Sequence, residues 1–257
     1  MGDLMMHTIL LICYLILGGI AAGILSSGAS IASLASYPVL LSVGLNPVSA
    51  NVTNDAALIW NSLGAVISSR RELRGHWKQV GYFAVFTVIG AATGCLLLLA
   101  FPTAVFAKLV PFFILTSGIM VLFSGRTISG GQEQRPFWQQ AFYCGLLIAV
   151  GIYAGYFGAA SGVLVLVLLT YLTADHFLTV NAIKNAVCGM TNLTALIIYS
   201  FTTHIYWRFA IPMAIGMFIG GYVGPIIIRK IPVTLIRIMI AVLAAIQAGI
   251  YFYQAYF

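Results

Sequence analysis

The chain has 257 residues, of which 61% are hydrophobic and only 7% are charged. A soluble domain with this composition would have too little polar surface to face water, so we expect a protein that crosses a membrane several times. The net charge of +7 does not indicate a nucleic-acid partner, because the basic residues lie in short segments between apolar stretches, as membrane topology requires.

Apolar stretches occupy nearly the whole chain, and about 20 such residues suffice to cross the hydrocarbon core. No Lys or Arg lies near the N-terminus, which argues against a cleaved signal peptide, so we expect residues 8–25 to form a retained helix. The stretches run, in order, over residues 8–45, 47–68, 79–100 and 105–124, and then over 139–174, 177–202, 208–228 and 233–254. One long stretch followed by three shorter ones therefore occurs twice.

This order predicts two homologous repeats, residues 1–124 and 139–257, joined by a polar linker at 125–138. Two asparagines stand at equivalent places in the repeats at a constant offset: Asn54 and Asn61 in the first, Asn185 and Asn192 in the second. The match in both length and polar positions favours a duplicated architecture.

The first stretch of each repeat is about 35 residues long, which is too long for a single crossing even with tilt. A Gly/Ser-rich interruption lies within each: Ala-Gly-Ile-Leu-Ser-Ser-Gly-Ala-Ser at 22–30 and Ala-Gly-Tyr-Phe-Gly-Ala-Ala-Ser-Gly at 154–162. We expect a broken helix or helical hairpin at each, in an all-α fold with eight to ten transmembrane segments. A hairpin gives each repeat an odd number of crossings, so the second repeat would be inverted.

The basic residues favour this inverted arrangement. With hairpins, and with the cluster at 70–78 placed inside, nine Lys and Arg lie inside and two outside, whereas single crossings give seven against four. The nine are Arg70, Arg71, Arg74, Lys78, Arg126, Arg135, Arg229, Lys230 and Arg237, and the two are Lys108 and Arg208. We therefore expect residues 70–78, 125–136 and 229–232 on one membrane side, and 101–105 and 203–207 on the other.

Interrupted helices at matching places in two repeats point to the substrate site of a secondary transporter. The start of a half-helix exposes backbone N–H groups that favour an anion, and we expect half-helices to begin near 27–30 and 160–163. Hydroxyl donors and glycines that admit close backbone approach complete the predicted site: Ser26, Ser27, Gly28, Ser30, Gly158, Ser161 and Gly162. Close helix packing through small residues is the alternative.

The second stretch of each repeat carries a polar stripe. Asn54 and Asn61 are seven residues apart and share a helix face, with Asn51 adding to it. In the second repeat the same helical spacing is followed by Asn181, Asn185, Cys188 and Asn192. We expect the two stripes to line a shared polar cavity and to bind substrate. Hydrogen bonds between helices are the structural alternative.

Two charged residues, Lys184 and Asp55, lie inside the apolar stretches, where charges indicate function. Lys184 stands beside Asn185 and suits an anionic substrate, with snorkelling to the membrane surface as the alternative. Asp55 stands beside Asn54. It is a candidate for proton coupling, for pairing with Lys184 or for capping a local break.

Neither a cofactor nor a metal is expected. Cys13, Cys95, Cys144 and Cys188 lie in apolar stretches without a C-x-x-C pattern. The chain has no G-x-x-x-x-G-K-[ST] phosphate-binding motif, so ion or substrate gradients would supply the energy. An intramembrane serine protease with Ser161 as nucleophile is a weaker alternative, because all four histidines fall at segment ends and a nucleophile needs no duplicate. The sequence does not separate a carrier from an anion channel.

Several stretches resemble the TauE/SafE sulfite-exporter family of membrane permeases. They are Ala35–Leu41, Asn46–Asn54, Ser62–Ala65 and Arg70–Leu73 in the first half, and Gly155–Gly162, Lys184-Asn185, Asn192 and Ile228–Pro232 in the second. The resemblance covers essentially the whole chain and implies transport of sulfite, organosulfonates, thiosulfate or related sulfur oxyanions and carboxylates. The segment Ser26–Ser30 departs from the glycine-richer motif usual in the family.

Together these features predict a secondary permease of small, sulfur-containing anions in the bacterial cytoplasmic membrane, working by alternating access. Its expected partners are the anion and the lipid bilayer. The sequence leaves the oligomeric state open, with a homodimer as one alternative.

Overall fold

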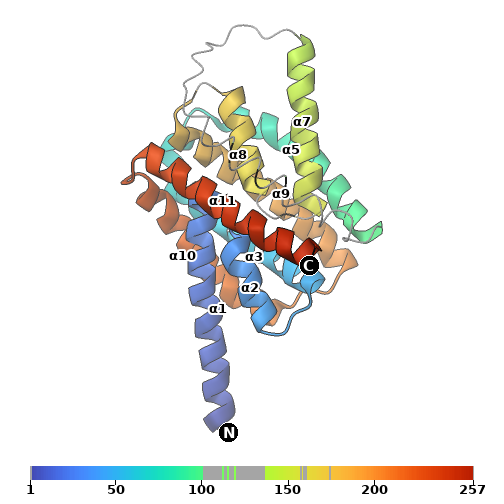
Figure 1. Cartoon of the computed structure of the whole chain (residues 1–257), viewed down its shortest axis with the longest axis vertical. Helices are drawn as coiled ribbons and strands as arrows, with labels where there is room; N and C mark the ends of the chain where they lie inside the picture. The colour runs from blue at the N-terminus through green and yellow to red at the C-terminus, as the bar shows by residue number, and fades with distance from the viewer. Residues whose placement is uncertain are drawn as a thin grey trace.

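The computed structural model describes residues 2–100, 137–156, 158, 161–173 and 175–256, with the isolated positions 112, 115 and 119. Every regular element among these residues is a helix (Figure 1). Within this described part of the chain, four helical segments are long and apolar enough, by length and composition, to cross a membrane: Met6–Gly28, Trp77–Leu98, Trp207–Ile228 and Val233–Ile250. The all-α membrane fold is therefore confirmed. Residues 125–136 of the predicted linker and most of the stretch at 105–124 lie outside the described residues, and the last two residues of that linker, Phe137 and Trp138, belong to a helix.

The described helices follow in chain order. They are α1 (Gly2–Ala29), α2 (Ser33–Ser42), α3 (Pro47–Ser68), α4 (Arg70–Leu73), α5 (Trp77–Ala100), α7 (Phe137–Tyr156), α8 (Ser161–Leu172), α9 (Phe177–Thr202), α10 (Trp207–Ile228) and α11 (Val233–Tyr256). Each half thus opens with a long helix, a break and a short helix.

The short helix α2 folds back along α1. The hydroxyl of Tyr14 lies 3.0 Å from Ser42 Oγ, and a methyl group added at Gly18 would lie 2.9 Å from Val39 Cγ2. From Tyr14 to Gly18 the residue number rises along α1, while that of the contacted residue of α2 falls from 42 to 39. The two helices are therefore antiparallel, as a helical hairpin requires. With 10 residues, α2 is about 15 Å long and reaches only halfway through a bilayer.

Local sequence signals explain where α2 ends and α3 begins. Gly44 has a φ of +89°, which suits glycine and terminates α2. Asn46 then caps α3, because its Oδ1 accepts a hydrogen bond from the Ser49 N–H at 2.8 Å. Pro47 occupies the first helical position, where its missing N–H costs nothing.

Two helix pairs pack through glycines spaced four residues apart, the G-x-x-x-G pattern of membrane helices. The glycines are Gly19 and Gly23 of α1 against Gly216 and Gly220 of α10, and Gly90 and Gly94 of α5 against Gly151 and Gly155 of α7. A methyl group added at Gly23 would lie 2.7 Å from Met217 O, so the two backbones touch. In each pair the helices run parallel, and each pair joins the first half of the chain to the second.

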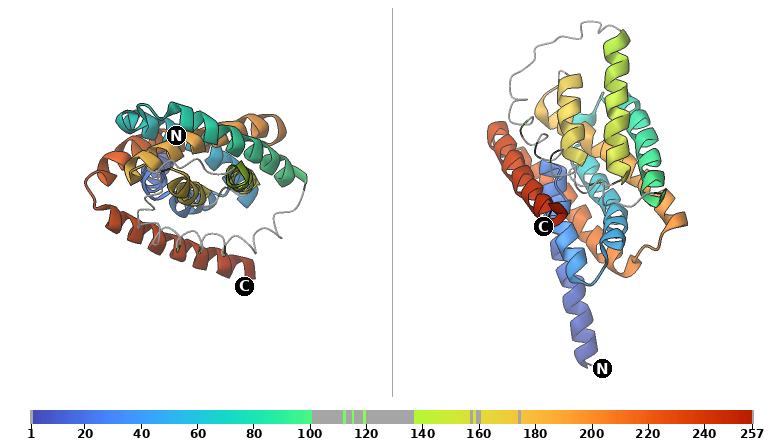
Figure 2. Two further views of the ribbon diagram at one scale, coloured as in Figure 1. Left: turned by 90° about the horizontal axis from the view of Figure 1, so that it is seen from above. Right: turned by 45° about the vertical axis from the view of Figure 1, so that its right-hand side comes forward.

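The polar helices α3 and α9 pack against each other, with α10 against α3 and α5 against α9. At one end His76 Nε2 lies 3.3 Å from Asp175 Oδ1, and further along a methyl group added at Gly189 would lie 2.8 Å from Ser62 Cβ. The order of these contacts makes α3 and α9 antiparallel. Figure 2 shows α11 along the edge of the bundle, away from this centre.

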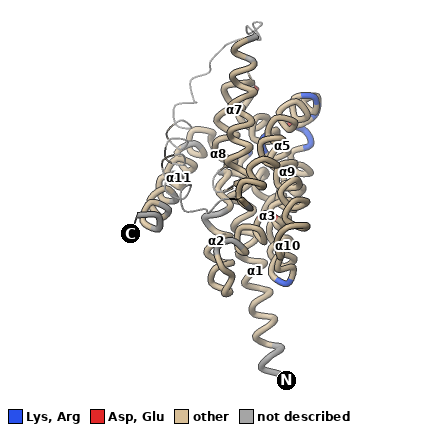
Figure 3. Tube along the Cα trace, turned by 90° about the vertical axis from the view of Figure 1, so that its right-hand side faces the viewer, with Lys and Arg blue, Asp and Glu red and all other residues tan. Residues whose placement is uncertain are grey.

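Most described Lys and Arg residues gather near the start of α5, and fewer lie at the opposite end beside α10 (Figure 3). Arg229 donates from Nε to Glu72 Oε1 at 2.7 Å and from Nη2 to Glu72 Oε2 at 3.0 Å. Burial raises the pKa of Glu72, but the hydrogen bonds and charge of Arg229 outweigh it and leave the pKa below its ordinary value. The segments around Glu72 and Arg229 therefore share one end of the bundle, and which side of a membrane this end faces stays a prediction.

Candidate functional site

The first break follows α1 at Ser30, whose φ of 64° makes it the one non-glycine residue with a positive φ among those described. This conformation costs about 1–3 kcal/mol and marks a site held by its surroundings. The predicted start of the half-helix near 27–30 is wrong. Ser26, Ser27 and Gly28 continue α1 to its last turn, and α2 begins only at Ser33.

Polar side chains of α9 reach this last turn of α1. The amide of Asn181 donates from Nδ2 to Ser27 O at 2.9 Å, and Asn185 donates to the same oxygen at 3.2 Å. The last carbonyls of a helix have no partner within the helix, so these bonds satisfy a buried acceptor. The first break therefore presents carbonyl oxygens to α9, rather than the N–H groups expected from the sequence.

Lys184 lies at the same place and is 2% exposed. Its Nζ donates to Ser30 Oγ at 2.8 Å and to Ser26 O at 3.2 Å. A cation at the carbonyl end of a helix is electrostatically favourable. Its burial argues against snorkelling, and no acidic side chain pairs with it in the described part of the chain.

The stripe on α3 also reaches the first break. Asn61 donates from Nδ2 to Ser26 Oγ at 2.8 Å. Asn54 is 5% exposed. Its Oδ1 has no hydrogen-bond partner among the described residues, and neither do Thr53 Oγ1, Asn61 Oδ1 and Asn181 Oδ1. Buried polar atoms are nearly always paired, so these unpaired atoms of α3 and α9 are candidate contacts for water or a ligand.

The second break lies at Gly158, whose φ of 72° ends α7. The backbone N–H and the hydroxyl of Ser161 both donate to Gly158 O, at 3.3 and 2.9 Å, and α8 begins at Ser161, within the predicted range. A methyl group added at Gly158 would lie 3.7 Å from Asp55 Oδ1 and 3.9 Å from Asn51 Oδ1. The second break thus faces the acidic residue of α3.

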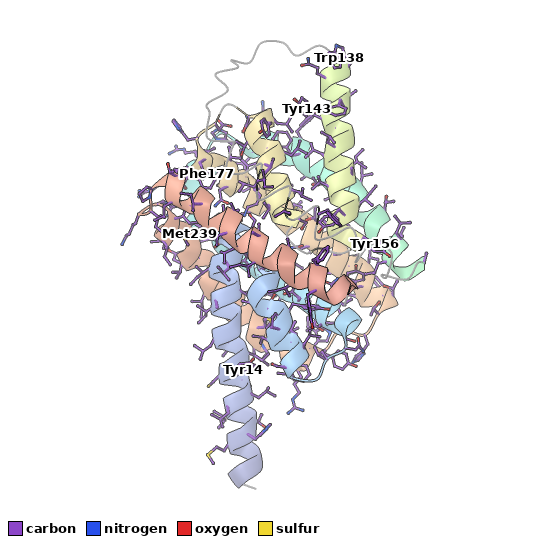
Figure 4. All side chains as sticks on the ribbon, in the orientation of Figure 1. Tyr14, Trp138, Tyr143, Tyr156, Phe177 and Met239 are labelled. Carbon is purple, nitrogen blue, oxygen red and sulfur yellow. The ribbon has the colours of Figure 1, made fainter. Side chains whose placement is uncertain are left out.

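The two breaks touch each other. A methyl group added at Gly162 would lie 3.0 Å from Ser30 Cβ, so the absence of a side chain there makes room for Ser30. Tyr156 ends α7 (Figure 4), and its side chain is buried. The fold therefore brings the duplicated motifs together in the interior, with Lys184 beside the first and Asp55 beside the second.

Substrate binding by Asn192 stays a prediction, and of the alternatives for Asp55 the pairing with Lys184 is not seen among the described residues. Asn192 is half-buried and forms no hydrogen bond within the described residues. Asn61, the counterpart of Asn192 in the first repeat, donates to Ser26 Oγ. In the second interruption the position equivalent to Ser26 is Gly158, which has no hydroxyl group. Asp55 and Lys184 form no ion pair, because they serve different breaks.

The stripe on α9 extends further than the sequence prediction took it. Tyr199 is fully buried and donates from its hydroxyl to Gly155 O at 2.9 Å, just before the second break. It stands seven residues after Asn192, so the same helical spacing that identified the asparagines would have included it. Asn181, which the sequence already places in the stripe, bonds the first break.

Comparison with known proteins gives a consistent result. The family profile for the sulfite exporter TauE/SafE matches residues 15–251. A probable membrane transporter protein of Haemophilus influenzae is 25% identical over 228 residues, covering 88% of both chains. The probable membrane transporter protein YfcA of Escherichia coli is 25% identical over 99% of this chain and 94% of its own. No solved structure matches the chain significantly.

Proposed function

Because the chain belongs to the sulfite exporter TauE/SafE family, we propose that it carries small anions across the bacterial cytoplasmic membrane by secondary transport. The proposed substrates are sulfite, sulfonates or related sulfur-containing anions. The site lies where the two breaks meet, and it opens to each side of the membrane in turn.

The observation that carries this proposal is the Lys184 ammonium. It is buried at the first break and has no acidic partner in the described region. A buried charge is costly unless it is paired. Two of its three protons are used, by Ser26 O and Ser30 Oγ, so one N–H and the full positive charge are left for an anion.

The helix arrangement supports alternating access between two inverted repeats. The matching helices α3 and α9 run antiparallel, and the first helix of each half packs along a late helix of the other, α1 on α10 and α7 on α5. Inverted repeats that meet at broken helices allow one repeat to rock against the other around a fixed site.

Transport is favoured over catalysis at the same site. The relatives are named as membrane transporters. The Ser161 hydroxyl, the nucleophile that an intramembrane protease would need, donates to Gly158 O. The imidazole that would activate it belongs at this break, yet His76 lies at the end of the bundle in contact with Asp175.

Counterflow in proteoliposomes tests the proposal. The purified full chain is reconstituted, loaded with unlabelled sulfite, thiosulfate, methanesulfonate or, for comparison, acetate or chloride, and exposed to a labelled trace of the same anion outside. We expect transient, saturable accumulation of at least one sulfur anion. Flux that does not saturate and does not depend on internal anion would indicate a channel, and no flux of any sulfur anion would contradict the proposed substrate class.

A further inference from the structure

The second break faces a buried acidic residue of α3, Asp55, whose presence anion binding alone does not explain. Asp55 is 5% exposed and lies on α3 with its Oδ1 directed at Gly158. Within the described residues it takes part in no hydrogen bond and no ion pair. A fixed negative charge here would weaken the binding of any anion at the neighbouring first break, so the site needs a means of neutralising it.

The described side chains around Asp55 do not supply that neutralisation. The titratable side chains that interact with it are the thiol of Cys95 on α5 and the phenol of Tyr199 on α9. Tyr199 directs its proton to Gly155 O. The other helices packed on α3 (α1, α2, α4 and α10) bring no charged group to it in the described structure, and the nearest cation on α9, Lys184, bonds the first break.

A proton fits this environment better than a metal ion does. The described residues contain no group of three or more His, Cys, Asp or Glu side chains that could hold a metal. The described side-chain oxygens near Gly158, besides the carboxylate, are those of Asn51 and Ser161, whereas hard cations take six or more oxygen ligands. A proton on the carboxylate needs no further ligand.

We propose that Asp55 takes up a proton together with the anion, so that the protein is a proton-coupled anion carrier. This inference rests on the proposed function. In the step, the carboxylate of Asp55 becomes a carboxylic acid as one proton binds it, while the anion binds beside Lys184. With a monovalent anion the pair adds no net charge to the membrane interior.

The two central helices link the two events physically. α3 carries Asp55 at the second break and Asn61 at the first, about 9 Å further along the helix. α9 carries Lys184 at the first break and Tyr199 at the second. Neutral Asp55 favours the anion, and by reciprocity the bound anion favours protonation of Asp55.

An infrared titration of the full-length protein tests the proton site without any substrate. We expect the carbonyl band of a protonated, buried carboxyl group that titrates with pH in the wild type. Asp55→Asn should remove it, whereas Asp175→Asn, which changes the acid beside His76 at the end of the bundle, should leave it. A band that survives in Asp55→Asn would overturn the proposal.

Transport driven by a pH gradient tests the coupling. One proton per methanesulfonate sustains about tenfold accumulation for each unit of pH gradient. Wild type and Asp175→Asn should accumulate the sulfur anions of the counterflow panel, Asp55→Asn should not exceed equilibration, and Asp55→Glu, which restores an acid, should recover accumulation. Accumulation in Asp55→Asn, or anion movement in the wild type that ignores the pH gradient or needs sodium, would overturn the proposal.

The two proposals fail differently. A wild type that shows no counterflow of sulfite, thiosulfate or methanesulfonate contradicts the proposed function, and with it the coupling. A wild type with counterflow but without a pH-driven component leaves the proposed function standing and contradicts proton coupling alone.

Discussion

Replacing Lys184 by glutamine removes the one buried cation at the first break. The ammonium donates to Ser30 Oγ at 2.8 Å and to Ser26 O at 3.2 Å, and we assign its remaining N–H to the anion. A hydrogen bond to a charged group contributes about 1.5–3 kcal/mol. Lys184→Gln should therefore lower anion affinity by about ten- to 150-fold.

Calorimetric titration of the purified variants with the anion that gives the largest counterflow measures this effect. Lys184→Arg keeps the charge and should retain more affinity than Lys184→Gln, although a planar fork does not replace a compact ammonium. The melting temperature of each variant, taken in parallel, separates binding from folding. Wild-type affinity in Lys184→Gln, with a lowered melting temperature, would refute the reasoning and reduce Lys184 to a cap on the end of α1.

Three further results are expected. Gly151→Ala should destabilise the protein by about 1–3 kcal/mol, because its new methyl group clashes with the backbone oxygen of Thr87 and meets Gly90 Cα of α5 at 3.0 Å. Gly145→Ala on the same helix meets nothing within 4 Å and should be neutral or stabilising in thermal unfolding; equal effects would contradict the glycine packing. Asn185→Ala should lower the melting temperature because it leaves Ser27 O with one donor fewer, while Asn54→Ala, which removes an Nδ2 donor that forms no hydrogen bond within the described residues, should mainly weaken anion binding, and unchanged affinity in calorimetry would make Asn54 structural. Glu72→Gln should lower the free energy of unfolding by about 0.5–1 kcal/mol at pH values above the ordinary glutamate pKa of 4.5. Because the pKa of Glu72 is lowered in the folded protein, this difference from wild type should vanish as the pH falls below that value; a difference that persists in acid would rule out the Arg229 pair as its source.

The local features of this fold are readable from the sequence. The duplicated Gly/Ser interruptions identify both breaks, Asn46-Pro47 marks the start of α3, and the polar stripes identify α3 and α9 as the helices that face each other. These signals depend on spacing and on backbone preference within one segment, which a single sequence displays directly.

The remaining features depend on contacts between distant segments. α1 extends to Ala29 because Ser30, a residue with little intrinsic preference for a positive φ, is held there in contact with Lys184 and Gly162. Likewise the separation of Lys184 and Asp55 between two breaks follows from the antiparallel packing of α3 and α9. The G-x-x-x-G spacings were visible in the sequence, but spacing alone does not say which glycine helix pairs with which.

The proposed path of the anion between the two breaks requires them to separate, and a covalent bond between them tests that requirement. Ser30→Cys and Gly162→Cys, in a protein whose four native cysteines are replaced, place two Cβ atoms about 3.0 Å apart, close to the 3.5–4.5 Å spacing of a disulfide. Oxidation should abolish counterflow of the sulfur anion, reduction should restore it, and neither single-cysteine variant should respond. Undiminished counterflow in fully cross-linked protein would contradict a path for the anion between the two breaks.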